Sequence, residues 1–421
     1  MIILLITLLC AGTVWAQAVD PQYLGHAGAH NLRQKNSAAF NWNPAVLSPE
    51  RGFRMSFELP SVMAAMGNNA FSVAYWNSHI AGEDTLSESD KNSILDRIPD
   101  DGWQANGEVS VPVVGFTYNK FGGRVTVESY QNVSLPRDVV ELVLKGNELN
   151  RRYEIGKFEG TSETVLDFTM GFGYRFEQEI IPDLHFGIGF HYYQGLYLAD
   201  VARADGELII TSGNDSIPGT INTSSVIQTL TSKRGDGVGF DLGGLALLNN
   251  KWEVGLAVRQ IGARMSWAVD ENHLISYYTD STGIAPDSLV NEDYVKSAFH
   301  YTDEEYHGGT YETHLPAIIQ LNSVYRANSK WTILGDVMIR TESSARGSAD
   351  IQVAGSGEYL AGHHFPLYGG LSVGGPLGWR FGLGGGLRFK GYELDLGWTW
   401  NGGMFNSAHG IGFGLSQRLK F

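Results

Sequence analysis

Residues 410–421 read Gly410-Ile-Gly-Phe-Gly-Leu-Ser-Gln-Arg-Leu-Lys-Phe421, and this stretch decides the fold class. Successive side chains of a β-strand point to opposite faces, so residues two apart share a face. One face carries only apolar residues except for Gln417: Ile411, Phe413, Leu415, Leu419 and Phe421. The other face carries glycine, serine, Arg418 and Lys420. An apolar outside and a polar, charged inside are typical of a transmembrane β-barrel.

The same period of two recurs along the chain. We predict strands at 107–119, 122–131, 164–177, 183–198, 236–249, 251–261, 315–327, 330–340, 351–360, 365–374, 379–389, 392–400 and 410–421. Segments 50–59 and 69–78 are further candidates, and one of them is expected to be incomplete because barrels of this type have even strand numbers. The expected fold is therefore all-β, a transmembrane antiparallel barrel of about fourteen strands. A β-sandwich with the same alternation is the alternative.

The connections predict which end faces outward. If the carboxyl end is periplasmic, the short turns at 248–251, 327–330 and 389–391 are periplasmic too. Residues 199–235 and 262–314 lack the strand pattern, and we interpret them as long outer loops. The second is strongly acidic, which fits either a solvated loop or a surface that attracts cations or basic partners. Residues 85–98 and 136–147 carry helix-start signals.

The first residues indicate export. Residues 1–18 contain an apolar run followed by Ala16-Gln17-Ala18, a pattern that signal peptidase cleaves. Cys10, the single cysteine, lies in this segment, where lipidation is a competing reading. The net charge of −15 argues against nucleic acid as a partner. We expect a protein of the Gram-negative bacterial outer membrane, with membrane lipid as its surroundings.

Residues 19–49 are too irregular for a strand and contain Phe40-Asn-Trp42-Asn43-Pro44-Ala45. Here the chain resembles the long-chain fatty-acid transporters of the outer membrane, whose N-terminal hatch carries an Asn-Pro-Ala motif just before the first strand. The resemblance extends to the overall layout and to the terminal Phe421, which would act as the assembly signal. It divides the chain into a signal peptide (1–18), a hatch or plug (19–49) and a barrel (50–421).

The resemblance also implies a function. Asn43, Pro44 and Ala45 would anchor the hatch, and Phe40 and Trp42 would contact a ligand in the lumen. Small hydrophobic molecules would cross passively and leave sideways into the membrane. Similar barrels with the same hatch also resemble the lipoprotein-shuttling component of the type 9 secretion system (PorV-like). The alternative is therefore a non-transporting barrel that binds secreted proteins or lipoproteins.

Charged residues fall on the face expected to point into the lumen, where a network of opposite charges would satisfy them. They are Asp167, Arg175, Glu253, Arg259, Asp336, Arg340, Arg380, Arg388, Glu393, Asp395 and Arg418.

We find no constellation that predicts an enzyme. Residues 370–374 match Gly-x-Ser-x-Gly but lie in an expected strand, whereas the nucleophile motif needs a strand-to-helix turn. The histidine pairs 26/30 and 363/364 lack the further ligands of a tetrahedral metal site. No cofactor, metal or catalytic residue is expected.

Overall fold

The computed structural model describes residues 20–29, 32, 37–48, 55–81, 86–176, 183–211, 220–279, 299–342, 350–375 and 378–421. The expected signal peptide lies outside these residues.

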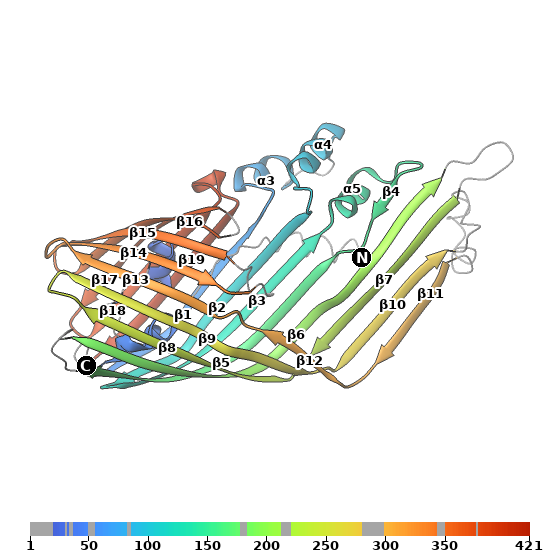
Figure 1. Cartoon of the computed structure of the whole chain (residues 1–421). Helices are drawn as coiled ribbons and strands as arrows, with labels where there is room; N and C mark the ends of the chain where they lie inside the picture. Colours follow the sequence, from blue (N-terminus) through green and yellow to red (C-terminus); the bar gives the residue numbers. More distant parts are fainter. Residues whose placement is uncertain are drawn as a thin grey trace.

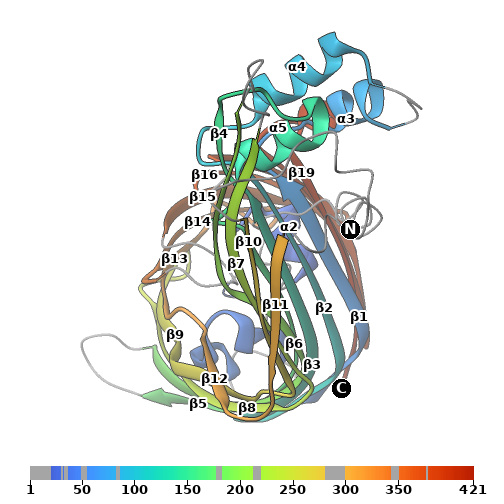
Figure 2. The ribbon, with the colours of Figure 1, turned by 90° about the vertical axis from the view of Figure 1, so that its right-hand side faces the viewer.

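Fourteen antiparallel strands form a closed ring (Figures 1 and 2). They are β1 (Met55–Asn68), β2 (Trp103–Tyr118), β3 (Phe121–Leu135), β5 (Glu159–Phe176), β6 (Leu184–Thr211), β8 (Gly235–Leu247), β9 (Trp252–Ala268), β13 (Ile318–Arg326), β14 (Trp331–Arg340), β15 (Asp350–Ala361), β16 (Phe365–Gly374), β17 (Trp379–Phe389), β18 (Tyr392–Asn401) and β19 (Gly410–Lys420). The ring closes where β1 pairs with β19. The predicted fold class and strand number are confirmed.

The two faces of the wall differ as the alternation predicts. On β19 the even-numbered residues up to Arg418 are buried inside, whereas Ile411 is 41% exposed on the outside. Closure leaves no unpaired strand edge in the ring, which is what backbone amides in a hydrocarbon surrounding require. The predicted short turns join β8 to β9, β13 to β14 and β17 to β18, at the same end as the carboxyl terminus.

The expectation of long loops at 199–235 and 262–314 is wrong for most of their described residues. β6 runs for 28 residues and continues beyond the ring. There it pairs with β4 (Arg152–Glu154) and β7 (Thr220–Ser232), and β7 pairs with β10 (Glu271–Thr279), followed by β11 (Phe299–Tyr306). β12 (Thr310–His314) prolongs the pairing of β9. In Figure 1 these strands project past the ring, and we call them the outer extension.

Three helices lie at the rim of the ring that is farther from the carboxyl terminus, which we call the outer rim (Figures 1 and 2). α4 (Glu88–Arg97) starts with a capping box between Ser87 and Asp90, and α5 (Arg137–Lys145) follows Pro136, so both predicted helical segments are confirmed. Segment 69–78 is not a strand: it leads into α3 (Val73–His79). Among the described residues, no helix is long and apolar enough to cross a membrane.

The N-terminal segment lies inside the ring (Figures 1 and 2). It comprises α2 (Pro21–Gly25) and two short 3₁₀ turns, η1 (Ser37–Asn41) and η2 (Pro44–Leu47), nearly all of whose residues are buried. α2 contacts β16 to β19, whereas η2 contacts β5, β6 and β8. One short segment therefore bridges two opposite parts of the inner wall. A further 3₁₀ turn, η5 (Phe405–Ser407), connects β18 to β19.

Candidate functional site

The Asn43-Pro44-Ala45 motif lies directly on the inner wall. The Asn43 side-chain carbonyl caps η2 by accepting from Ala45 N (3.0 Å). Its amide nitrogen donates to the backbone carbonyls of Gly244 (3.0 Å) and Leu256 (3.3 Å) on β8 and β9. Asn43 is fully buried, so both ends of its amide are satisfied by protein and not by water. The motif thus fastens η2 to β8 and β9.

Glycines on the inner face make room for this motif. A Cβ atom on Gly187 would lie 2.1 Å from the Pro44 carbonyl carbon, and one on Gly243 would lie 2.1 Å from Asn43 Oδ1. Both distances are far below van der Waals contact, so the wall accepts the motif only because these residues lack side chains. We call this part of the inner wall the β8 seat.

A second seat holds α2 on the opposite wall. A Cβ atom on Gly397 would lie 1.8 Å from the Pro21 carbonyl oxygen, and one on Gly382 would lie 2.3 Å from the Leu24 carbonyl oxygen. Arg380 donates to the Tyr23 hydroxyl (3.1 Å). We call this part of the wall, formed by β17 to β19, the β18 seat.

Phe40 and Trp42 both lie in the lumen. The Phe40 ring lies against Gly171, where an added Cβ would come within 2.4 Å of it. Trp42 stacks on Tyr23 (ring centroids 5.1 Å apart) and lies 5.7 Å from the Arg259 guanidinium. The two aromatic residues therefore pack against the wall and against other side chains, and their contact with a ligand stays a prediction.

The wall beside the β8 seat is irregular. The pairing of β8 with β9 shifts register twice around Phe240, leaving extra residues on β9. Gln260 on β9 has φ of +56°, an uncommon value for a residue other than glycine. Its backbone N–H donates to Asp241 Oδ1 (2.8 Å). A side chain therefore satisfies an amide at the point where the ladder is interrupted.

Asp241 is itself held by a histidine. His191 Nε2 lies 2.9 Å from Asp241 Oδ2, and its Nδ1 lies 3.0 Å from Asp167 Oδ2. All three side chains are buried. The carboxylate–imidazole–carboxylate chain thus links β5, β6 and β8 just inside the irregular part of the wall.

An apolar groove of about 570 Å³ lies on the outer face of the same wall. Gly122, Gly171 and Gly189 are cross-strand neighbours and end beside Asp241. These three glycines line the groove together with Phe116, Phe121, Met170, Phe172, Ile188, Phe190, Phe240 and Leu242. At Gly171, therefore, only backbone separates Phe40 inside from the groove outside.

The lumen also contains an apolar cluster nearer to the outer ends of β6 and β9. It consists of Val165, Tyr193, Leu198, Ala263, Met265, Trp267 and Leu315. Trp267 is fully buried, and its indole N–H donates to Thr313 Oγ1 (3.0 Å). A molecule crossing from the outer end would meet this cluster before the N-terminal segment.

The predicted lumen charges are brought into several separate contacts. Glu253 pairs with Arg326, Arg340 with Asp350 (3.0 Å) and Arg175 with Asp183 (2.7 Å). Asp336 accepts from Gln320 and Asn322, and Arg380 donates to Asn401 (2.8 Å). Arg388, Glu393, Asp395 and Arg418 form one cluster with Lys420. Asp167 contacts the imidazole of His191, and the guanidinium of Arg259 lies over the ring of Trp42.

Several charged or polar residues that face the lumen were not predicted from the sequence. Arg124 pairs with Glu58, which also accepts from Ser37 (2.5 Å) in the N-terminal segment. His191 and Asp241 were missed as well, although both occupy inward positions of predicted strands and the alternation alone could have found them. Within the described residues, no group of three or more histidine, cysteine, aspartate or glutamate side chains is arranged so that it could hold a metal ion.

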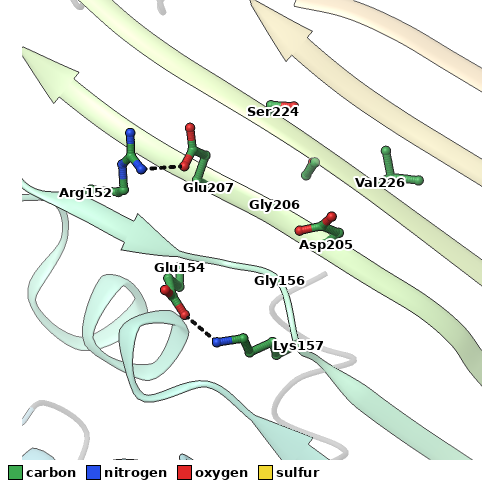
Figure 3. Close-up of a pocket in the computed structure, with 10 residues that line it drawn as sticks. Arg152, Glu154, Gly156, Lys157, Asp205, Gly206, Glu207, Ser224 and Val226 are labelled. Atoms are coloured by element: carbon green, nitrogen blue, oxygen red, sulfur yellow. Dashed lines mark hydrogen bonds and ion pairs between the residues drawn. The ribbon is translucent and has the colours of Figure 1, made fainter.

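A polar pocket of about 340 Å³ lies in the outer extension, between β4, β6 and β7 (Figure 3). Two ion pairs line it, Arg152 with Glu207 (3.2 Å) and Lys157 with Glu154 (2.9 Å). These side chains are largely exposed, so the pairs contribute little to stability. The pocket is chemically unlike the apolar groove on the wall.

The comparisons with solved structures agree on the fold. A Pseudomonas aeruginosa FadL homologue matches with a TM-score of 0.52 at 13% identity, over 98% of this chain and 100% of its own. The Ralstonia pickettii toluene transporter TbuX matches with a TM-score of 0.51 at 10% identity, over 96% and 98%. The monoaromatic hydrocarbon channel CymD matches with a TM-score of 0.50 at 11% identity, over 98% of both chains. The fold is that of an outer-membrane β-barrel.

Residues 44–397 match the model of a family described as "Family of unknown function (DUF5723)", and because they make up most of the chain, the protein belongs to that family. No curated protein matches the sequence.

Proposed function

We propose that this protein lets small hydrophobic molecules cross the outer membrane by passive diffusion, without covalent chemistry, and that the N-terminal segment acts as its hatch. One observation carries the proposal. The apolar groove lies outside the same glycine row against which Phe40 packs inside, next to the interrupted pairing of β8 and β9. An inner aromatic residue, a wall of glycine backbone and an outer apolar groove support a sideways route for a hydrophobic solute.

The route that we propose runs from the apolar cluster around Trp267, past the N-terminal segment, to the wall beside Asp241. Its last step passes between β8 and β9, where two register shifts interrupt the ladder. A hydrophobic solute then enters the groove and the bilayer. The fold is shared with proteins described as a toluene transporter and a monoaromatic hydrocarbon channel, which supports solutes of this class.

Uptake into vesicles tests the proposal. The purified chain in phospholipid vesicles should admit toluene or oleate faster than empty vesicles do. A disulfide between F240C and I261C, which are cross-strand partners at the irregularity, should slow this entry until it is reduced. The chain has one native cysteine, Cys10, within the expected signal peptide.

A matched pair separates the route from a general stiffening of the barrel. Leu396 and Leu415 are cross-strand partners on the regular wall, so the L396C/L415C disulfide should leave entry unchanged. No entry above empty vesicles for either solute would overturn the proposed function. Equal entry with both disulfides would leave passage in place but reject the route between β8 and β9.

The comparisons offer no support for a barrel that binds secreted proteins or lipoproteins. That alternative predicts recovery of a protein partner when cells are crosslinked and the barrel is purified. The hypothesis of passive transport predicts that the purified barrel in vesicles is active without any partner protein.

A further inference from the structure

His191 on β6 lies between two carboxylates on the inner side of the wall. Its Nδ1 is 3.1 and 3.0 Å from the two oxygens of Asp167 on β5, and its Nε2 is 2.9 Å from Asp241 Oδ2 on β8. The three side chains are at most 9% exposed. Both ring nitrogens of one imidazole therefore contact acidic groups in a buried setting.

The two contacts require one proton more than a neutral ring and two ionised carboxylates possess. A neutral imidazole donates from one ring nitrogen and accepts at the other, and an ionised carboxylate only accepts, so one contact would bring two acceptors together. With the additional proton, and with the Arg259 guanidinium that attracts Asp241, the buried group is electrically neutral. Without it, one negative charge would stay uncompensated in the buried group, which is costly.

Other donors place this proton on the ring and not on a carboxylate. The Thr169 hydroxyl donates to Asp167 Oδ2 (3.1 Å), and the Gln260 backbone N–H donates to Asp241 Oδ1 (2.8 Å). Hydrogen bonds of this kind favour the ionised form of a carboxyl group. Both carboxylates are therefore ionised, and both nitrogens of the ring donate.

The remaining neighbours do not compete for the proton. Tyr193 stacks on the ring, with the two centroids 5.6 Å apart. The η2 turn, which contacts β5, β6 and β8, consists of Pro44-Ala-Val-Leu47 and has no titratable side chain. The charge state of His191 thus depends on the two carboxylates and on Arg259.

Asp241 uses its two oxygens for different contacts. Oδ2 accepts from His191, and Oδ1 accepts from the Gln260 amide at the interrupted pairing of β8 and β9. Because the two oxygens belong to one planar group, the contact with His191 also orients the oxygen that satisfies the strand amide. His191 therefore acts on the interruption through Asp241.

We propose that His191 is an imidazolium and a positioning residue for the passage between β8 and β9. Its two N–H groups hold Asp241 on the Gln260 amide and keep the interrupted wall closed in the absence of solute. The part in passage rests on the proposed function, whereas the charge state and the hold on Asp241 do not. A neutral side chain that can serve only one of the two carboxylates loosens the wall.

Nitrogen NMR measures the charge state in the unaltered protein. The whole chain, labelled at the histidine ring nitrogens, is studied in detergent micelles at neutral pH. The signals of His191 are those that disappear in His191→Gln or in the double variant His191→Gln, Asp167→Asn. They should show a proton on both ring nitrogens. A ring with one protonated nitrogen would overturn the inference.

His191→Gln tests the hold on Asp241. Its amide nitrogen can donate to one carboxylate, but its carbonyl then faces the other. We expect about tenfold faster hydrogen exchange in residues 257–262 and about tenfold faster entry of toluene into vesicles, the effect of one lost hydrogen bond to a charged group. Heat-dependent migration on gels checks that each variant is folded.

The double variant His191→Gln, Asp167→Asn provides a rescue. The new asparagine amide can donate to the glutamine carbonyl, which leaves the glutamine amide free to donate to Asp241. Both rates should return close to those of the unaltered protein. His273→Gln is the matched control, because His273 also contacts a carboxylate, that of Asp303, but lies in the outer extension. It should change neither rate.

The measurements fail separately. Unchanged exchange in residues 257–262 of His191→Gln would overturn the positioning role, and so would a double variant that exchanges as fast as the single one. Faster exchange with unchanged entry would remove His191 from passage and leave the proposed function in place. If the unaltered protein admits no solute, the proposed function is wrong, and the charge state and the hold on Asp241 are still decided by NMR and exchange.

Discussion

The two seats of the N-terminal segment differ in the wall that surrounds them. Around the β18 seat, β17 to β19 pair in unbroken register, and Asp395 is held by both Arg388 and Arg418. Around the β8 seat, the pairing of β8 with β9 shifts twice, and a side chain replaces a ladder hydrogen bond. The first seat resembles a fixed attachment, and the second lies beside an interrupted part of the wall.

This difference suggests how one segment can close a barrel and still permit opening. In the proposed transport, an attachment at the β18 seat would keep the segment in the lumen while its other end, from Phe40 to Leu47, left the irregular wall. With two regular walls, the same movement would create no sideways route. The predictions below test whether the two walls differ in this way.

The largest effect is expected at Asp395. Asp395→Ala leaves Arg388 and the fully buried Arg418 without their shared carboxylate. Loss of one partner of a buried ion pair typically costs about 3–5 kcal/mol. Urea unfolding in detergent micelles should show this loss in the free energy of unfolding. Glu154→Ala, which breaks the exposed pair with Lys157, should leave the free energy of unfolding almost unchanged and serves as the control.

Adding one methyl group at either seat should displace the N-terminal segment. Gly397→Ala and Gly187→Ala each place a Cβ within about 2 Å of backbone atoms of that segment, and such overpacking costs roughly 1–3 kcal/mol. Proteolysis of residues 20–48 should accelerate in both. Only Gly187→Ala should also raise solute entry into vesicles. Gly355→Ala has open space around the new atom and should change neither quantity.

Asp241→Ala should loosen the wall locally. The Gln260 amide loses its acceptor, at a cost of about 1–3 kcal/mol. Hydrogen exchange measured by mass spectrometry should become faster in residues 257–262 and stay unchanged in β18. Asp336→Ala is the matched control because Asp336 accepts from the side chains of Gln320 and Asn322. Faster exchange in β18 for Asp241→Ala would show that the two walls are not independent.

The smallest effect is expected at His273, which contacts a carboxylate as His191 does but lies in the outer extension. In the outer extension, the hydrogen bond to Asp303 raises the pKa of His273, with help from Glu305 and Glu271. Protonated His273 is therefore favoured in the folded state, so its contribution to stability is complete below the ordinary histidine pKa and disappears as pH rises through the raised pKa. Exchange protection of β10 and β11 should fall over that window. His273→Asn should remove the pH dependence without affecting β18.

The sequence predicted the ring well because one face of each membrane strand meets hydrocarbon and the other face meets the polar lumen. Residues 410–421 show this requirement at every second position, and the inward charges followed from it. The outer extension was missed for the opposite reason. Its strands lie outside the hydrocarbon, so residues such as Glu304 and Glu305 need no apolar neighbour at the next position.

The site could be predicted only in its local part. The Asn43 cap on Ala45 is a short-range feature that Asn before Pro favours. The partners of Asn43 on β8 and β9 are about two hundred residues away, and nothing near Asn43 specifies them. The register shift at Gln260 likewise depends on Asp241 from another strand. Such contacts arise from closure of the ring, which a linear pattern does not contain.

The length of β6 has a mechanical consequence. The same unbroken strand carries Gly187 in the β8 seat and Glu207 in the outer extension, and it pairs along nearly its whole length. A hydrogen-bonded strand resists stretching and bending within its sheet. Moving the part of β6 beyond the rim of the barrel therefore also moves the part that lies in the wall. Force exerted on the end of β6 that lies in the outer extension is therefore transmitted along covalent bonds to the place where Pro44 rests.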